Sequence, residues 1–309
     1  MTSFLEALAR YVSQTLTGDL ADTVILLPNR RAGVFFRRFL ARQLPGATWM
    51  PEVISVDDYV NGQSRLQRID ALETLFLLHG EYSRLTKEPD PFDVFFHWGE
   101  IMLRDFDELD KYLVDADQLF RNLTDLKALE DPLAGLTEEQ IPFIRRFWEG
   151  FHAGDATREK QSFLETWEQL PRLYHGLRAS LLARNQAYPG MQYRELIRDI
   201  REGRFGLPPA QRVVVAGFNA LNACEKALFG WLKEHDAQFF WDWDREYMEE
   251  TWQEAGRFMR DNRRDFPEAR ALEPFDNLSG TKDIRIFELP SDVMQAKFLH
   301  TLLEESGPV

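Results

Sequence analysis

Residues 212–244 constrain the fold more than any other stretch of the sequence. An apolar, β-branched run at residues 213–216 ends at Gly217, and a second apolar run at residues 237–241 ends at Asp242. Continuous apolar strands are typical of a parallel sheet that is covered on both faces. We therefore expect a strand–helix–strand unit with its loops at the carboxyl ends of the strands. The apolar residues of its crossover helix have helical spacing: Leu221, Cys224, Leu228, Trp231 and Leu232.

A second unit of the same kind is predicted near the start of the sequence. Residues 23–27 and residues 49–56 each have the pattern of a strand. An amphipathic helix is expected between them at residues 30–44, and Asp57 is a suitable N-cap for a short helix over residues 58–61. The longer helix is expected to turn these residues inward: Val34, Phe35, Leu40 and Leu44.

The two units are separated by residues 66–202, which show helical patterns and no convincing strand. We predict an α/β protein whose single sheet is assembled from distant segments, with an all-helical insertion between them. The expected parts are residues 1–64 and 206–282 for the α/β core, 65–205 for the insertion, and 283–309 for the start of a following truncated domain. The predicted helices of the insertion are 66–86, 91–107, 116–129, 138–151, 159–182 and 193–202, and the last part is expected to hold a strand at 283–287 and a helix at 291–305 capped by Ser291.

Composition narrows the classes of function. The net charge of −14 argues against nucleic-acid binding over the whole surface, while a local basic face remains compatible with it. The single cysteine, Cys224, falls on the apolar side of its helix and is expected to be a core residue. No stretch reaches the ~20 apolar residues that a membrane span needs, and the first residues lack the pattern of a signal peptide. We expect a cytoplasmic protein.

Several kinds of chemistry have no motif in this sequence. There is no GxxxxGK[ST] and no GxGxxG loop to hold phosphates, and no HExxH or HxxxH pattern to hold a metal. Asp242 and Asp244 at a strand end are a weak candidate for Mg²⁺ binding, against the simpler interpretation of a strand end and helix cap. The acidic run at residues 105–110 is expected to be a solvated helix face.

Only one dense basic cluster stands at a predicted strand end. Asn29, Arg30 and Arg31 open the helix over residues 30–44, where free backbone N–H groups favour an anion. The phosphates of a nucleic acid are one candidate, and a solvated basic helix face is the alternative. Further basic residues on the same helix are Arg37, Arg38 and Arg42.

These stretches resemble the AddB/RecC-like subunits of bacterial helicase–nuclease repair complexes, and more closely a subgroup of PD-(D/E)XK nuclease family proteins. The matching stretches are VILLPNRRAGVFFRRFLA at 24–41, PEVISVDDYVN at 51–61, FDELDKYLVDADQLFRNLT at 106–124 and VVVAGFNALNACEKALFG at 213–230. The resemblance implies a P-loop-NTPase-like, superfamily-1 helicase-like parallel sheet whose first domain carries a helical insertion.

The same resemblance assigns positions to helicase motifs. Residues 28–31 stand at motif Ia, residues 55–58 at motif Ib, and residues 217–220 near motifs II and III. In active helicases the Ia and Ib loops touch a single DNA strand. The implied nucleic-acid-binding residues are Asn29, Arg30, Arg31, Ser55, Asp57, Phe218 and Asn219, with Ser55 donating to a phosphate and Phe218 stacking on a base.

Two departures from the family imply that ATP hydrolysis is lost. A Walker A loop should precede the first strand, but a helix headed by Ser3 stands there, and Phe218 and Asn219 replace the Asp-Glu pair of motif II. The family's nuclease motifs lie beyond residue 309. The expected function is a non-catalytic, cofactor-free helicase-like module of a DNA end-processing helicase–nuclease protein, which binds DNA or scaffolds the nuclease beside a partner helicase subunit. The alternatives are a nucleotide-dependent motor with an unrecognised phosphate site, a hydrolase that uses Asp242 and Asp244, and a purely protein-binding scaffold.

Overall fold

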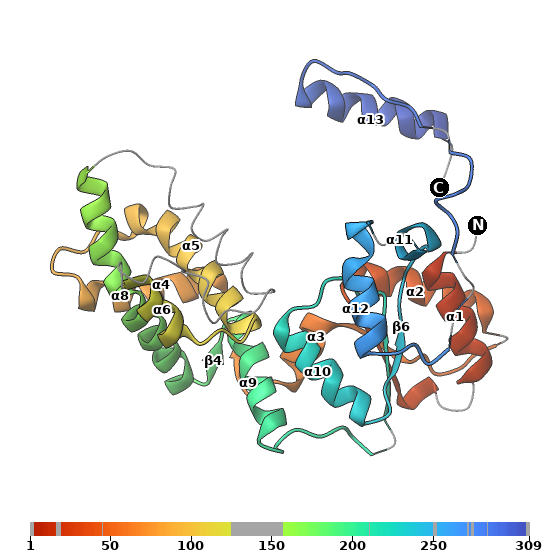
Figure 1. Ribbon diagram of the computed structural model, residues 1–309, viewed down its shortest axis with the longest axis horizontal. Helices are drawn as coiled ribbons and strands as arrows, with labels where there is room; N and C mark the ends of the chain where they lie inside the picture. The colour runs from red at the N-terminus through yellow and green to blue at the C-terminus, as the bar shows by residue number, and fades with distance from the viewer. Residues whose placement is uncertain are drawn as a thin grey trace. The chain divides into compact units, whose positions relative to one another are not determined.

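The computed structural model describes residues 3–16, 20–44, 46–124, 157–209, 211–249, 252–270, 272, 275–282 and 284–306. The chain divides into two compact units, Met1–Phe275 and Asp276–Val309. Figure 1 shows the elements of both units as a ribbon. The predicted helix at residues 138–151 lies outside the described residues.

A four-stranded parallel sheet forms the centre of the first unit. Its strands are β1 (Thr23–Leu27), β2 (Glu52–Ser55), β5 (Arg212–Ala216) and β6 (Gln238–Phe240), in the order β2-β1-β5-β6. The two central strands pair directly, with Ile25 opposite Val214. The predicted α/β class and the assembly of one sheet from two distant segments are therefore confirmed.

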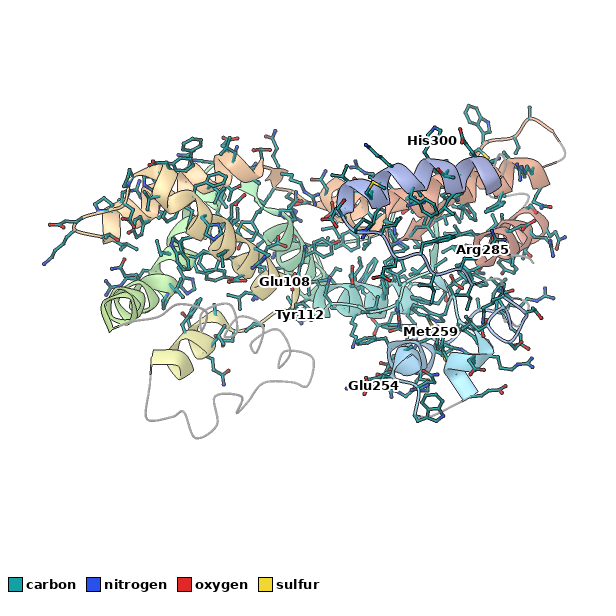
Figure 2. The ribbon with its side chains drawn as sticks, turned by 90° about the horizontal axis from the view of Figure 1, so that it is seen from above. Glu108, Tyr112, Glu254, Met259, Arg285 and His300 are labelled. Atoms are coloured by element: carbon teal, nitrogen blue, oxygen red, sulfur yellow. The ribbon has the colours of Figure 1, made fainter. Side chains whose placement is uncertain are left out.

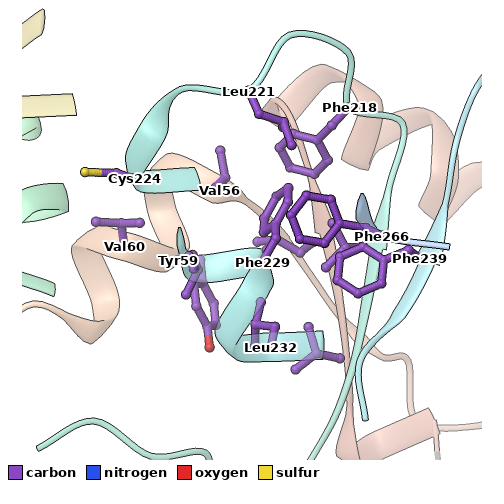
Figure 3. Packing of buried hydrophobic residues seen from close by; sticks show 14 of the residues in the cluster. Val56, Tyr59, Val60, Phe218, Leu221, Cys224, Phe229, Leu232, Phe239 and Phe266 are labelled. Carbon is purple, nitrogen blue, oxygen red and sulfur yellow. The ribbon is translucent and has the colours of Figure 1, made fainter. Parts of the chain in front are cut away.

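Helices cover both faces of this sheet because side chains alternate along its buried strands. Ile25 and Leu27 pack with α1 (Phe4–Thr15) and α2 (Arg30–Gln43). Val24 and Leu26 point to the opposite face, into the cluster that contains α3 (Val56–Gln63) and α10 (Ala223–Glu234). Figure 3 shows part of this second cluster, in which Phe229 of α10 lies among other aromatic rings.

Two local predictions about this core are wrong. On α2, Phe36 is fully buried, whereas Val34 and Phe35 are 62% and 40% exposed, so the inward face of the helix is rotated from the predicted one. The N-cap of α3 is Ser55 and not Asp57, because the Oγ of Ser55 accepts a hydrogen bond from the backbone N–H of Asp58 at 3.2 Å.

The insertion is mainly helical. It contains α4 (Ala71–Leu85), α5 (Phe92–Lys111), α6 (Ala116–Thr124), α8 (Thr157–Ala183) and α9 (Pro189–Arg201). The expectation of no strand is wrong, because β3 (Gln67–Arg68) and β4 (Gln186–Ala187) form a two-stranded parallel sheet. Two residues per strand are too few to produce an alternating pattern that sequence reasoning can detect.

A buried carboxylate organises the insertion's core, contrary to the solvated helix face expected for residues 105–110. Asp110 is fully buried near the carboxyl end of α5, which Figure 2 marks with the labels of Glu108 and Tyr112. Its carboxylate accepts hydrogen bonds from the Tyr188 hydroxyl, from the Tyr174 hydroxyl at 2.6 Å and from Arg178 Nη1 at 2.7 Å. Arg194 Nε lies 2.6 Å from Asp110 Oδ1. These donors replace the water that the charge loses on burial.

Helix α9 joins the insertion to the sheet. Tyr193, Leu196 and Ile197 are buried in the same apolar cluster as α3 and α10. At the start of α9, the Gln192 side chain donates hydrogen bonds to Asn61 Oδ1 at 3.0 Å and to the Leu66 carbonyl oxygen at 2.9 Å. Because Met191 at the start of the same helix is buried in the insertion's own cluster, α9 contributes to the cores of both parts.

The remaining elements complete the two units. In the first unit these are the 3-10 helices η1 (Leu20–Asp22) and η2 (Glu254–Gly256), α11 (Arg245–Glu249) and α12 (Arg257–Asp265), which carries Met259 (Figure 2). In the second unit, α13 (Asp292–Ser306) begins as predicted, with Ser291 Oγ accepting from the Met294 N–H. The predicted strand is wrong, because residues 284–287 do not adopt strand structure.

None of the helices in the described residues combines the length and the apolar composition required to cross a bilayer.

Candidate nucleic-acid interface

The predicted site residues stand along one edge of the sheet. Because all four strands are parallel, their carboxyl ends meet at this edge, in the order Ser55, Leu27, Ala216 and Phe240. The chain runs outward from β1 to β2 and in the other direction from β5 to β6. The centre of the edge is thus a topological switch point, where doubly wound sheets bind ligands.

Asn29 and Arg31 belong to the start of α2, directly after β1. The Asn29 side chain accepts a hydrogen bond from the Ala32 N–H at 2.9 Å and so caps the helix. Pro28 before it has no N–H to donate. Arg31 is exposed, and its guanidinium group lies 5.9 Å from the centre of the Phe35 ring.

Arg30, Ser55 and Asp58 form a linked group across the ends of β1 and β2. Arg30 Nε donates to Asp58 Oδ2 at 2.7 Å, and the Ser55 hydroxyl donates to the same oxygen at 2.6 Å. These two hydrogen bonds, from Arg30 first and then from Ser55, lower the pKa of Asp58 to about 2. Ser55, predicted to donate to a phosphate, is only 5% exposed, and its hydroxyl donates to Asp58 within the protein.

Asp57 also has a partner within the protein. It pairs with Arg68 of β3, whose Nη2 donates to Asp57 Oδ1 at 3.1 Å. Arg68 Nε donates in turn to Gln192 at 2.8 Å. Asp57 therefore ties α3 to the insertion, and as an anion it does not favour phosphate at this position.

Phe218, predicted to stack on a DNA base, is buried in this structure, so its ring is not presented at the surface. It is 3% exposed, its ring meets the Phe229 ring edge to face at 4.9 Å, and it lies beside Leu221 (Figure 3). Burial of the Phe218 ring in this apolar cluster is favourable because it removes apolar surface from water. Asn219 is exposed, and its carbonyl oxygen accepts a hydrogen bond from the buried Asn262 side chain at 2.6 Å.

Apolar side chains fill the space at the switch point. Gly217 follows β5 with φ +73°, a conformation that side chains rarely adopt. A Cβ added there would lie 3.3 Å from the ring of Phe4 and 4.0 Å from Pro28. Phe4 is itself 5% exposed. The position that holds phosphates in many doubly wound proteins is thus packed by a phenylalanine and a proline.

The other side of α2 presents an uncompensated basic surface. Arg31, Arg38 and Arg42 are exposed, and within the described parts of the chain none of them forms an ion pair. Arg37 donates to the carbonyl oxygen of Val53. The helix contains no acidic residue. We call Arg31, Arg38 and Arg42, together with the exposed Val34 and Phe35 between them, the α2 basic face.

The Asp242 and Asp244 pair lies just beyond β6. Loss of hydration raises the pKa of Asp242, although its side chain remains exposed at the surface, and the charge of Asp244 raises it further. Across the described residues, no three His, Cys, Asp or Glu side chains are grouped to hold a metal ion. Asp244 instead caps α11 by accepting from the Glu246 N–H at 3.1 Å.

Sequence reasoning missed the two side chains that organise this edge, Asp58 and Arg68. The signal for Asp58 was present, because Ser55 followed three residues later by an acidic side chain is a pattern typical of helix starts. No local pattern points to Arg68, whose partners are Asp57 and the distant Gln192.

No protein-family model matches this chain, and no curated protein matches it either.

Proposed function

We propose that this chain is a helicase-like module of a DNA end-processing helicase–nuclease protein, without ATPase activity of its own, and that it binds single-stranded DNA through the α2 basic face. The observation that carries the proposal is a helix with five arginines and no acidic residue in a chain of net charge −14. Surface arginines that lack acidic neighbours are available to phosphates.

The geometry assigns unequal roles to the arginines. Arg30 is held by Asp58, so its charge is largely compensated. Arg31 and Arg38 are exposed and have no acidic partner in the described residues, which makes them the stronger candidates for phosphate contacts. Phe35, 40% exposed between them, is the aromatic side chain placed to contact a base.

The lack of ATPase activity is supported by the packing at the switch point. A phosphate cradle needs several free backbone N–H groups and a cation. Here Pro28 lacks an N–H, the Asn29 side chain already accepts from the Ala32 N–H, and Phe4 packs against Gly217. DNA-stimulated ATP turnover by the purified chain would contradict this part of the proposal.

The test is a titration of fluorescein-labelled oligothymidylate at several salt concentrations. We expect Arg31→Ala with Arg38→Ala to weaken binding and to flatten the plot of log affinity against log salt by about 0.7 for each phosphate of the single strand that is no longer neutralised. The matched control is Arg84→Ala, which removes an exposed arginine paired with Glu81.

Equal affinity and equal salt slope in the double variant and the wild type would overturn DNA binding by the α2 basic face. Binding that weakens to the same degree in the Arg84→Ala control would point to net charge and not to this surface. In either case the protein-binding scaffold becomes the better description of the module.

A further inference from the structure

Helices α4 and α5 carry an exposed aromatic surface that takes no part in the apolar clusters on either face of the sheet. Leu72 and Phe76 of α4 are 48% and 54% exposed, and Phe92 and Phe96 of α5 are half-buried. The rings of Phe76 and Phe92 stack with their centres 4.2 Å apart, and Phe96 meets Phe92 edge to face at 5.9 Å. We call these four side chains the aromatic patch. They form a continuous apolar surface across two helices.

The patch rests on a closely packed base. Leu75 and Phe95, directly beneath it, are each 2% exposed. A Cβ added to Gly99 would lie 2.6 Å from the Phe95 ring of the same helix and 3.1 Å from the Leu75 side chain of α4, so Gly99 lies in a tightly packed contact between α4 and α5. The surface is therefore formed before any partner binds, which lowers the entropy lost on binding.

Acidic side chains border the patch. Glu73 lies one turn before Phe76, Asp93 follows Phe92, and Glu100 lies one turn after Phe96. All three are exposed, and none has an ion pair in the described residues. Such a border repels phosphates and attracts cationic side chains.

We propose that the aromatic patch docks a basic amphipathic helix of a partner protein, with apolar side chains on the aromatic rings and Lys or Arg side chains beside Glu73, Asp93 and Glu100. An apolar centre with a charged rim is the usual construction of a protein interface, and aromatic anchors supply most of its binding energy. The acidic rim distinguishes this surface from the α2 basic face, and the proposal does not depend on DNA binding there.

The probe is a fluorescein-labelled amphipathic peptide of about 18 residues, with Leu and Phe on one face and Lys on the other. A second peptide keeps the apolar face and carries Glu in place of Lys. We expect the Lys peptide to bind the full chain at least about tenfold more tightly than the Glu peptide, as measured by fluorescence anisotropy.

Two sets of variants separate the patch from the rest of the surface. Phe76→Ser should weaken binding of the Lys peptide at least about tenfold, whereas Val34→Ser, at an apolar residue of α2 that is 62% exposed, should not change its affinity. Reversing the rim with Glu73→Lys, Asp93→Lys and Glu100→Lys should make the Glu peptide the tighter ligand.

The charge control reverses three acids elsewhere, namely Glu52, Glu234 and Glu246, all exposed. If this control changes peptide preference as much as the rim reversal does, attraction to overall charge explains the binding and the proposal fails. It also fails if the Lys peptide does not bind, if Phe76→Ser lowers oligothymidylate affinity instead, or if sedimentation shows a dimer of this chain that Phe76→Ser dissociates. Circular dichroism melting curves confirm that each variant is folded.

Discussion

The most constrained residues of this protein are charged side chains enclosed by the fold. Asp110 is surrounded by Tyr174, Tyr188, Arg178 and Arg194, which together solvate its charge in place of water. Burial, followed by the nearby Asp110 charge, raises the pKa of Tyr188 well above its usual value, so this hydroxyl remains a donor across the physiological range. Removing one charged member of this network is expected to lower the free energy of unfolding, because its partners then lose their compensating charge.

Asp110→Asn is expected to destabilise the protein by about 2–3 kcal/mol, because it removes the only carboxylate near Arg194 and one of the two that pair with Arg178 in the described residues. The free energy of unfolding in urea measures the effect. Asp93→Asn, an exposed acid on the same helix, is the control and should change stability by less than about 0.5 kcal/mol. A loss for Asp110→Asn no larger than that of the control would show that the network adds little to stability.

Stability should also depend on pH through Asp58. Its pKa falls from 3.8 in the unfolded chain to about 2 in the folded one, so the folded state binds its proton less readily. The resulting stabilisation is present above about pH 4 and is lost as the pH falls from about 4 to 2. Because Arg30 is largely exposed, we expect about 1 kcal/mol and not the full value of the shift.

The measurement compares urea unfolding of the wild type and Asp58→Asn at about pH 6, above this window, and at about pH 2.5, within it. The difference between the two proteins should shrink at the lower pH, where the wild-type carboxyl group is becoming protonated. A difference that stays constant over this range would mean that the ion pair with Arg30 does not contribute.

At the scale of elements, sequence patterns located the strands and most helices but not always their faces. The two central strands, β1 and β5, were detectable because parallel strands buried on both sides are rich in apolar residues. On α2, by contrast, three consecutive apolar residues, Val34, Phe35 and Phe36, fit either of two faces, and only contact with β1 and β2 selects Phe36. The prediction that the acidic run of α5 is solvated was wrong because Asp110 is enclosed by side chains of other helices, Arg178 of α8 and Arg194 of α9, which the local sequence does not reveal.

Because Phe36 and not Phe35 lies on the buried face of α2, the two residues should contribute differently to stability. Phe36→Ala should cost about 3–5 kcal/mol because it opens a cavity beneath the sheet, whereas Phe35→Ala should cost less than about 1 kcal/mol because its ring is already 40% exposed. Thermal unfolding followed by circular dichroism distinguishes the two. Similar losses at both positions would indicate that both side chains are buried.

At the scale of the whole molecule, the location of the candidate site could be predicted from the sequence, but the exposure of its side chains could not. The position of Asn29, Arg30, Ser55 and Gly217 at one edge followed from the expectation of a parallel sheet, in which the carboxyl ends of all strands meet at the same edge. The exposure of each side chain did not, since it depends on how the folded elements pack, as for Phe218 against Phe229 and for Ser55 against Asp58, which is also held by Arg30.

The insertion and the sheet should unfold together, because α9 belongs to the cores of both. Leu196→Ala, on α9 but only 3% exposed within the sheet cluster, should cost about 2–5 kcal/mol and lower the unfolding midpoint of both parts equally. Hydrogen exchange of β5 reports the sheet, and hydrogen exchange of α8 reports the insertion. Leu182→Ala, 40% exposed, is the control, and separate midpoints for the two probes would show independent parts.

The order of the strands has a consequence for synthesis on the ribosome. The inner edge of β1 pairs with β5, which is translated only after the whole insertion has been made. At ~5–20 residues per second, the Val24–Leu26 edge waits on the order of ten to forty seconds with its backbone unpaired. An apolar strand edge in that state is prone to association with other nascent chains. Slowing translation within the insertion should therefore increase the aggregated fraction of newly made protein, and a trigger-factor-type chaperone that covers this edge should reduce it.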